Sequence, residues 1–205
     1  MTSLYERLIL PRLIDCACGA RVVTKRRAAV VPQAEGRVLE IGIGTGLNLR
    51  HYDRRRVSSI VGIDPGVSMH PLAERRARDA GLAVELMPLS AETLPAADAS
   101  FDSIVCTYSL CTIPDPAAAL IEMRRVLKPG GKLLIAEHGR APDPSVRAWQ
   151  QRLQPLWGRL AGGCHLGRDI PALIANAGFE VTLKAKYLHR PHFAGYHYWG
   201  VMRTP

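Results

Sequence analysis

The sequence has no apolar run of the ~18 to 20 residues that a membrane-spanning helix needs, and its start lacks the apolar core of a signal peptide. It has no C-x-x-C pair, and its five cysteines are an odd number, which argues against a disulfide framework and a structural zinc site. Internal repeats and low-complexity segments are also missing. A single cytoplasmic domain with reduced, mostly buried thiols is therefore expected.

Aromatic residues are scarce, at 6%, whereas arginine dominates a formal charge of +9. The basic residues form four clusters on separate helices and loops: Lys25–Arg27, Arg54–Arg56, Arg75–Arg78 and Arg124–Arg125. Because few aromatics interleave with them, solvated faces are favoured over a nucleic-acid interface. No nucleic-acid partner is expected, while peripheral contact with an anionic membrane stays open.

The stretch from residue 36 to residue 48 reads GRVLEIGIGTGLN. An apolar, β-branched run is followed by glycines at three alternate positions, Gly42, Gly44 and Gly46. This order predicts a strand, a tight turn, and then a helix that begins near Thr45 and continues to about Tyr52. Glycines adopt positive φ and let a ligand approach the backbone closely, so the turn is interpreted as a small-molecule cradle.

The glycine spacing differs from the dinucleotide fingerprint, G-x-G-x-x-G, and Glu40 stands two residues before the first glycine. A like-charge pair at ~5 Å in an effective dielectric near 20 costs roughly 3 kcal/mol, so Glu40 disfavours a pyrophosphate. It favours a ligand that carries an ammonium group, such as S-adenosylmethionine. The alternative is a strand-to-helix turn that binds no ligand.

Two helical stretches precede the glycine turn. A capping-box pattern, Ser3-Leu4-Tyr5-Glu6, opens the first, which Pro11 is expected to kink or divide and Gly19 to end. The second runs from about residue 20 to residue 31. Residues 1–35 are therefore interpreted as an N-terminal helical extension that acts as a lid or packs against the sheet, in preference to resting on a membrane.

Residues 36–205 are predicted to form a doubly wound α/β domain. After the first strand, strands are expected at residues 58–64, 84–89, 101–107 and 132–137, with helices at 68–80, from Asp115-Pro116 to about 127, and at 172–177. Pro142-Asp143-Pro144 is interpreted as a turn. Two consecutive strands, 180–188 and 194–202, predict an antiparallel hairpin at one edge of a mostly parallel sheet.

Residues at the carboxyl ends of these strands are the candidate site, since open parallel sheets bind ligands there. Asp64 ends the second strand and is expected to bind ribose hydroxyls, with an N-cap as the alternative. Tyr108 and Cys111 follow the fourth strand and His138 the fifth. Tyr108 is predicted to orient an acceptor and His138 to take its proton, although a structural histidine and a packed cysteine are the alternatives.

Five motifs in order resemble the class I S-adenosylmethionine-dependent methyltransferases: Val38–Asn48, Gly62–Asp64, Ser90–Glu92, Ser100–Asp102 and Arg125–Gly131. The resemblance implies a seven-stranded Rossmann-like sheet and S-adenosylmethionine as cofactor, with S-adenosylhomocysteine as product. It implies that Glu40 and the three glycines hold the methionine part, that Asp64 holds the ribose, and that Ala91 and Glu92 lie at the adenine. Pro65 and Thr107 complete the predicted cofactor set. Ser90 stands where the family often has aspartate.

The last third of the chain resembles, more narrowly, methyltransferase-like alkyl-thiol S-methyltransferases, through Glu137-His138, Trp149–Gln151, Pro155–Trp157, Gly163–Leu166 and Arg190–His192. Those proteins carry a hydrophobic N-terminal anchor, whereas this chain has a short amphipathic start. The likeness implies a small or hydrophobic thiol as the acceptor. No metal is expected to be required, because methyl transfer is an in-line displacement at a carbon that the sulfonium already activates. The alternatives are N-methylation of a phospholipid headgroup of the phosphatidylethanolamine type or of another small molecule, and a non-catalytic module that binds the cofactor.

Overall fold

The computed structural model describes residues 10–203, in which seven strands form one sheet in the order β3-β2-β1-β4-β5-β7-β6. The strands are β1 (Gly36–Ile41), β2 (Val57–Ile63), β3 (Val84–Met87), β4 (Phe101–Thr107), β5 (Leu127–His138), β6 (Leu183–Tyr187) and β7 (Tyr196–Arg203). Strand β7 runs antiparallel to both of its neighbours, and the other pairs are parallel. The predicted sheet and its C-terminal hairpin are confirmed.

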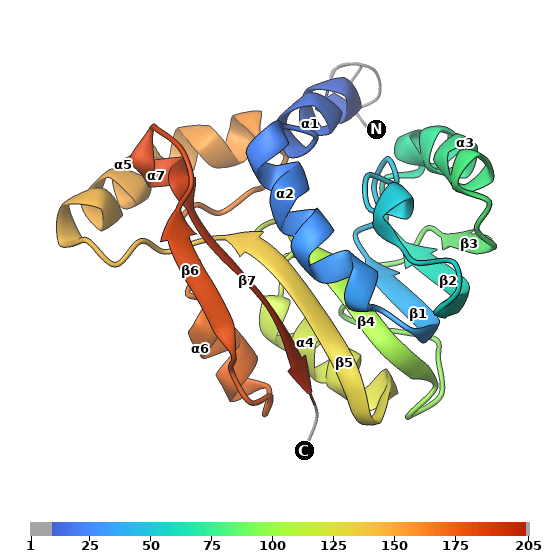
Figure 1. Ribbon diagram of the computed structural model, residues 1–205. Coiled ribbons are helices and arrows are strands. Elements are labelled where there is room, and N and C mark those ends of the chain that lie inside the picture. Colours follow the sequence, from blue (N-terminus) through green and yellow to red (C-terminus); the bar gives the residue numbers. More distant parts are fainter. Residues whose placement is uncertain (1–9, 204–205) are drawn as a thin grey trace.

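Helices cover both faces of the sheet (Figure 1). They are α1 (Leu10–Cys18), α2 (Arg21–Val30), α3 (His70–Ala80), α4 (Pro116–Val126), α5 (Pro144–Leu160), α6 (Ile170–Asn176) and α7 (His192–Gly195), with short 3₁₀ helices η2 (Val31–Gln33), η3 (Leu49–His51) and η4 (Val67–Met69). Helices α4 and α6 pack on one face, and α2 and α3 contribute to the core on the other. No helix within residues 10–203 is both long and apolar enough to cross a bilayer.

The central strands are apolar at consecutive positions because both faces are covered. Ile104 and Leu133 belong to the core under α4 and α6, whereas their chain neighbours Val105 and Leu134 belong to the core under α2. This pattern holds the sheet rigidly, and the loops at the carboxyl ends of its strands are positioned by it.

The predicted start of α4 is confirmed in atomic detail. The Asp115 side chain accepts hydrogen bonds from the backbone N–H groups of Ala117 and Ala118, and Pro116 occupies the first turn. An aspartate that satisfies two free N–H groups at a helix start stabilises it by about 1 kcal/mol. The helix therefore begins at the residue where the sequence indicates it.

The helix predicted to begin near Thr45 is not formed, and only the short η3 follows the glycine turn. Gly46 adopts φ +80°, outside the right-handed helical region. A Cβ on Gly46 would lie 2.7 Å from the Leu49 Cδ1 and 3.0 Å from the Ala73 Cα, so this glycine serves close packing against α3. The helix prediction was wrong because the positive φ of Gly46 interrupts a right-handed helix that begins at Thr45.

One further difference concerns a helix. The 17-residue α5 was not predicted: Asp143 and Pro144, interpreted as part of a turn, are the N-cap and first residue of this helix, which continues through Pro155. At the other end of the chain, α1 stops before Gly19 and α2 follows, as predicted. The capping box at residues 3–6 lies outside the described residues. Val30 and Val31 are fully buried, so the N-terminal extension contributes to the core.

Candidate functional site

A cavity of ≈ 330 Å³ lies at the carboxyl ends of β1, β2 and β4. This is within the range of about 300–1,000 Å³ that small-molecule sites occupy, and it is where open α/β sheets bind ligands. Seven of the residues predicted for the site line it: Gly42, Gly44, Asp64, Pro65, Ala91, Thr107 and Tyr108. Glu40, Gly46, Glu92 and His138 are not among its lining residues.

The glycine turn lines the cavity with two of its three glycines, Gly42 and Gly44. A different physical requirement explains glycine at each of these two positions. Gly42 has φ +64°, and a Cβ on it would lie 2.2 Å from the Ser109 Oγ. Gly44 has φ +53°, but a Cβ there would meet nothing closer than the Met69 Sδ at 3.7 Å. Gly42 is thus required by packing, whereas a side chain on Gly44 would enter space that a ligand can use.

The Asp64 side chain connects the loop after β1 to the loop after β2. Its Oδ2 accepts a hydrogen bond from the Gly44 N–H at 3.0 Å, and its Oδ1 accepts one from the Gly66 N–H at 2.7 Å. Burial raises the pKa of this carboxyl, and the two backbone donors oppose that rise. The carboxylate lines the cavity at the end of β2, which is the position expected of a ribose ligand.

Glu40 lies beneath the cavity in a buried polar network and is only 1% exposed. Its Oε1 accepts a hydrogen bond from the Asn48 Nδ2 at 3.0 Å, and its Oε2 accepts one from the Tyr52 hydroxyl at 2.7 Å. Burial raises the Glu40 pKa to about 7, although both hydrogen bonds and the Arg27 charge oppose the rise. Because both carboxyl oxygens have protein partners, Glu40 shapes the floor of the cavity from below.

Arg27 of α2 reaches the cavity from the N-terminal extension, although sequence reasoning had placed it on a solvated face. It is 5% exposed, and its Nη1 donates to the Asn48 Oδ1 at 3.0 Å and to the Thr107 Oγ1. Its Nε is buried and has no hydrogen-bond partner among the described residues. Arg27 also lines the cavity, and a buried guanidinium at a ligand cavity suits an anionic group such as a carboxylate.

The loop after β3 divides between two roles. Ser90 and Ala91 line the cavity, as expected of residues beside an adenine. The Glu92 Oε1 instead accepts a hydrogen bond from the Asp115 N–H at 3.2 Å, which joins this loop to the start of α4. The structure therefore places Glu92 behind the cavity wall, and its predicted adenine contact stays a prediction.

Tyr108 follows β4, lines the cavity and has a strained backbone. Its φ of +54° is uncommon for a residue other than glycine and costs of order 1–3 kcal/mol. Its hydroxyl lies 3.1 Å from the His197 Nδ1, and the Arg27 guanidinium carbon lies 5.0 Å from the centre of its ring. Burial raises the pKa of the Tyr108 phenol, so the group stays protonated. Tyr108 is held in place by groups from β7 and α2.

His138 is the last residue of β5, and its side chain lies beside the Cys164 sulfur. Its Nε2 lies 3.1 Å from the Cys164 Sγ, and Cys111 is the third member of the same compact group. Hydrogen bonds from Cys164 and His138 hold the pKa of the Cys111 thiol well below its usual range. Burial opposes protonation of His138, but the nearby Cys111 sulfur outweighs it and raises the His138 pKa. The structure thus joins two residues that sequence reasoning treated separately and adds Cys164.

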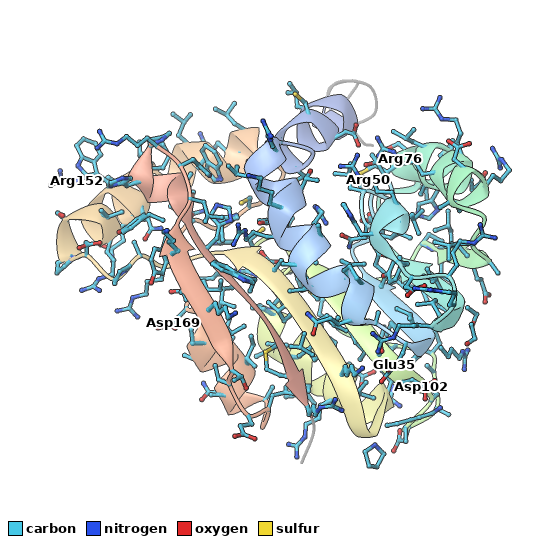
Figure 2. The ribbon with its side chains drawn as sticks, viewed as in Figure 1. Glu35, Arg50, Arg76, Asp102, Arg152 and Asp169 are labelled. Atoms are coloured by element: carbon cyan, nitrogen blue, oxygen red, sulfur yellow. The ribbon has the colours of Figure 1, made fainter. Side chains whose placement is uncertain are left out.

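The N-terminal helices are tied to the far side of the glycine turn. The Asp15 carboxylate of α1 lies 2.7 Å from the Arg76 Nη1 of α3, and both side chains hydrogen-bond the Thr45 hydroxyl. Figure 2 shows Arg76 between the N-terminal helices and α3. Cys18, at the end of α1, lines the cavity. The extension therefore contributes residues to the cavity wall, and its role as a lid stays a prediction.

Comparison with known proteins gives this geometry a context. A family profile described as "Methyltransferase domain" matches residues 39–135. Thiol S-methyltransferase TMT1B of Rattus norvegicus is 36% identical over 152 residues, 72% of this chain and 62% of that protein. Thiol S-methyltransferase TMT1A of Homo sapiens is 33% identical over 177 residues, 80% and 71% of the two chains. Phosphatidylethanolamine N-methyltransferase of Cereibacter sphaeroides is 36% identical over 160 residues, 77% of each.

The chain belongs to the class I S-adenosylmethionine-dependent methyltransferases. A solved structure described as a SAM-dependent methyltransferase from Thermotoga maritima has the same fold, with a TM-score of 0.65, 21% identity, and coverage of 98% of this methyltransferase and 97% of that chain. This methyltransferase spans about 62% of the length of TMT1B. Since the relatives are named for thiols and for a phospholipid, membership of the family does not select the acceptor.

The cavity of this methyltransferase suits S-adenosylmethionine, the cofactor of its family. Gly44 offers room beside its backbone, Asp64 offers a carboxylate for hydroxyl groups, and Arg27 offers a buried guanidinium. Of these three, only Arg27 escaped the sequence analysis. The one signal was its place in a basic cluster just before the first strand, and nothing in the sequence distinguished it from Lys25 and Arg26.

Proposed function

We propose that this methyltransferase transfers the methyl group of S-adenosylmethionine to the sulfur of a small or hydrophobic thiol. The supporting observation is the charge of the cavity wall: among the described residues that line it, Asp64 is the only acid, and it serves the loops after β1 and β2. The part of the wall that follows β4 carries Tyr108, Thr112 and Ile113. A cationic acceptor would lack a counter-charge there, whereas a neutral thiol does not require one.

The cofactor end of the cavity supplies the binding groups. The Gly42–Gly44 backbone receives the methionine part, Asp64 receives the ribose hydroxyls, and Ala91 lies against the adenine. Arg27 supplies the charge that pairs with the methionine carboxylate. Glu40 acts through Asn48, which it orients toward Thr107 and Arg27.

The acceptor end of the cavity aligns the reactants and excludes water from them. S-adenosylmethionine supplies a methyl carbon that its sulfonium already activates, so in-line placement is the main requirement on the protein. Tyr108 orients the acceptor from the wall, and the Cys18 end of α1 helps to exclude water. Exclusion of water favours a thiolate attack on a sulfonium, because opposite charges cancel as the bond forms.

An acceptor panel with methyl-labelled cofactor tests this function. We expect labelled thioether from thiophenol and octanethiol, and none from phosphatidylethanolamine vesicles. Tyr108→Phe keeps the ring and removes the hydroxyl, so it should raise KM for the thiol while the affinity for cofactor, measured by calorimetry, stays unchanged. Label in vesicle lipid without label in any thiol would overturn the thiol assignment.

A second candidate function, N-methylation of a phospholipid headgroup, is favoured by the surface of α5. Its outward side exposes Trp149 (55%), Leu156 (61%) and Leu160 (59%) at helical spacing. Arg152, also exposed, lies at the edge of the molecule (Figure 2). Apolar side chains flanked by arginine are typical of helices that lie in a membrane interface. The phosphatidylethanolamine relative adds to this possibility.

Vesicle sedimentation separates the two functions. If α5 docks the protein for a lipid acceptor, Trp149→Ser with Leu156→Ser should abolish both sedimentation with anionic vesicles and lipid labelling. Under the thiol assignment the same double variant should retain thiol labelling. Cofactor binding without transfer to either acceptor, or to any component of a metabolite extract, would instead favour the non-catalytic module.

A further inference from the structure

Behind the residues that line the acceptor end of the cavity lies a compact group of potential metal ligands, Cys111, His138 and Cys164. One ligand atom from each lies within 4.8 Å of the other two, and both cysteines are buried. Bond lengths for a tetrahedral zinc ion with two sulfur ligands and one imidazole place the ligand atoms about 3.6–3.8 Å apart. The observed spacing requires only small side-chain movements to reach that geometry.

Cys111, His138 and Cys164 come from three segments, and each segment is held in place by its own set of hydrogen bonds. Arg168 donates from its Nη1 to the backbone oxygens of Leu110 and Ile113, which fixes the loop that carries Cys111. The Gln154 side chain bonds the Cys164 oxygen at 3.0 Å and the Leu166 N–H at 2.8 Å, which fixes the loop after α5.

His138 is fixed by strand pairing, because it lies opposite His197 in the ladder of β5 and β7. All three donors are therefore held on rigid supports, as a metal site requires.

The group also borders the cavity. Thr112 lines the cavity, and its Oγ1 lies 3.5 Å from the Cys111 Sγ. Gly162, two residues before Cys164, lines it as well. The group provides three protein ligands among the described residues, so a tetrahedral metal ion bound to them would keep a fourth position for another ligand.

We propose that Cys111, His138 and Cys164 bind Zn²⁺ and that the fourth position of the metal receives the acceptor thiol. Two thiolates with one imidazole form a donor set that zinc enzymes use when they keep a position open for substrate. Soft sulfur ligands also favour zinc over magnesium or calcium. The assignment of the fourth position rests on the proposed thiol S-methyltransferase function, whereas the metal site itself does not.

The chemistry balances without an oxidant or reductant. As the thiol binds, its S–H proton leaves to solvent and a sulfur electron pair bonds to zinc. When that sulfur attacks the methyl carbon, the new carbon–sulfur bond forms while the bond from the methyl to the sulfonium breaks. The electron pair of the broken bond stays on the cofactor sulfur, and the neutral thioether dissociates from the metal. In this arrangement His138 is a metal ligand and proton removal is assisted by zinc.

Metal analysis of the full, reduced protein tests the site. After chelation, reloading with one equivalent of Zn²⁺ and desalting, we expect about one zinc per chain in the wild type and in Cys16→Ser, which removes an exposed thiol of α1. Cys111→Ser and Cys164→Ser should each lose most of it. Thermal melts and cofactor calorimetry check that the variants fold. Absence of bound zinc in the reduced wild type, or full zinc in a folded Cys111→Ser, would overturn the proposal.

Cobalt substitution of the wild type gives a test that does not depend on variants. The Co²⁺ form should show the near-ultraviolet sulfur-to-cobalt charge-transfer band of two thiolates, and thiophenol added without cofactor should intensify it as a third thiolate binds. A two-thiolate band that thiophenol leaves unchanged would overturn the substrate role. An intensified band together with no methylation of any thiol would retain the site and refute the proposed function.

Discussion

The two ends of the cavity are built in different ways. The cofactor end comes from consecutive loops after β1, β2 and β3, and its contacts are mainly backbone ones, such as the bonds from Gly44 and Gly66 to Asp64. The acceptor end is lined by residues from α1, the loop after β4 and the loop after α5, and the end of β5 lies behind them. The first end depends on local chain geometry and the second on packing between distant segments, so the two should respond differently to substitution.

The largest effect is expected where the two ends meet, at Gly42. Gly42→Ala would bring a Cβ to 2.2 Å from the Ser109 Oγ at a positive φ, which should lower the free energy of unfolding by about 3 kcal/mol. Gly44→Ala should lower it by about 1 kcal/mol, because its Cβ has room, but should weaken cofactor binding. Urea denaturation and calorimetry measure the two quantities.

Gly130→Ala is the matched control for backbone conformation alone. Gly130 has φ +71°, and no heavy atom lies within 4 Å of the Cβ that alanine would add. Its loss of unfolding free energy should resemble that of Gly44→Ala. Equal losses at Gly42 and Gly130 would contradict the claim that Gly42 is a packing contact between the two ends.

Asp64 tests whether the cofactor end works as a unit. Asp64→Ala removes the acceptor for two backbone N–H groups and the group assigned to the ribose, so we expect the affinity for S-adenosylmethionine to fall about 100-fold. Calorimetry measures it. Glu85→Ala, an exposed acid of β3, is the control and should bind normally. Unchanged affinity in a folded Asp64→Ala would refute the ribose assignment.

Glu40 should give the protein without ligand a characteristic dependence on pH. Its pKa in the folded state is about 7, above the usual 4.5, so the folded state holds the proton more tightly than the unfolded state does. The resulting stabilisation is complete below about pH 4.5 and is lost as the pH rises through 7. Between pH 5 and 8 the loss should be about 2 kcal/mol.

The comparison for this pH effect is Glu40→Gln, which keeps the shape and removes the titration. Arg27, Asn48, Tyr52 and Asp64 all influence the Glu40 carboxyl, so only the difference between the two proteins isolates it. Urea denaturation across the pH range supplies that difference. Parallel curves for the wild type and the variant would show that Glu40 ionises normally in its buried network.

The cofactor end was largely predictable from the sequence, since its residues lie in short motifs. Glycines with positive φ, an acid at a strand end and Asp115 before a proline each have a local physical reason, and the structure places Gly42, Gly44 and Asp64 on the cavity as expected. The exceptions were local as well. Gly46 satisfies the same pattern for a different reason, which is its close packing against α3.

The acceptor end was predicted only in part because its contacts cross long distances in the chain. His138 and Cys111 were identified from their places at strand ends, but Cys164 joins them only through the fold. A search for closely spaced cysteines cannot detect ligands that are 26 or more residues apart. Arg27 was missed for a similar reason, since its burial depends on how α2 crosses the sheet.

Arg27 tests the comparison between the two ends of the cavity, because it belongs to the N-terminal extension but is assigned to cofactor binding. Arg27→Lys keeps the charge but loses the planar fork, so we expect the affinity for S-adenosylmethionine and for S-adenosylhomocysteine to fall equally, by about 10-fold. Both molecules carry the carboxylate that Arg27 would bind. Arg26→Lys is the adjacent control, because Arg26 packs over the Trp199 ring and does not line the cavity. A loss confined to the sulfonium form would contradict the carboxylate assignment.

The smallest effect is expected at the Asp15–Arg76 bridge, which ties α1 of the extension to α3. Hydrogen bonds from Arg76 lower the Asp15 pKa, so the bridge persists at neutral pH. Partly exposed ion pairs contribute less than about 1 kcal/mol, and Asp15→Asn should therefore barely change the unfolding free energy.

If the extension is a lid, the same change should speed cofactor release about threefold, which stopped-flow displacement measures. Asp53→Asn breaks the bridge to Arg55, whose side chain is 89% exposed, and should leave release unchanged. Equal release rates in all three proteins would mean that the extension packs against the sheet without gating the cavity.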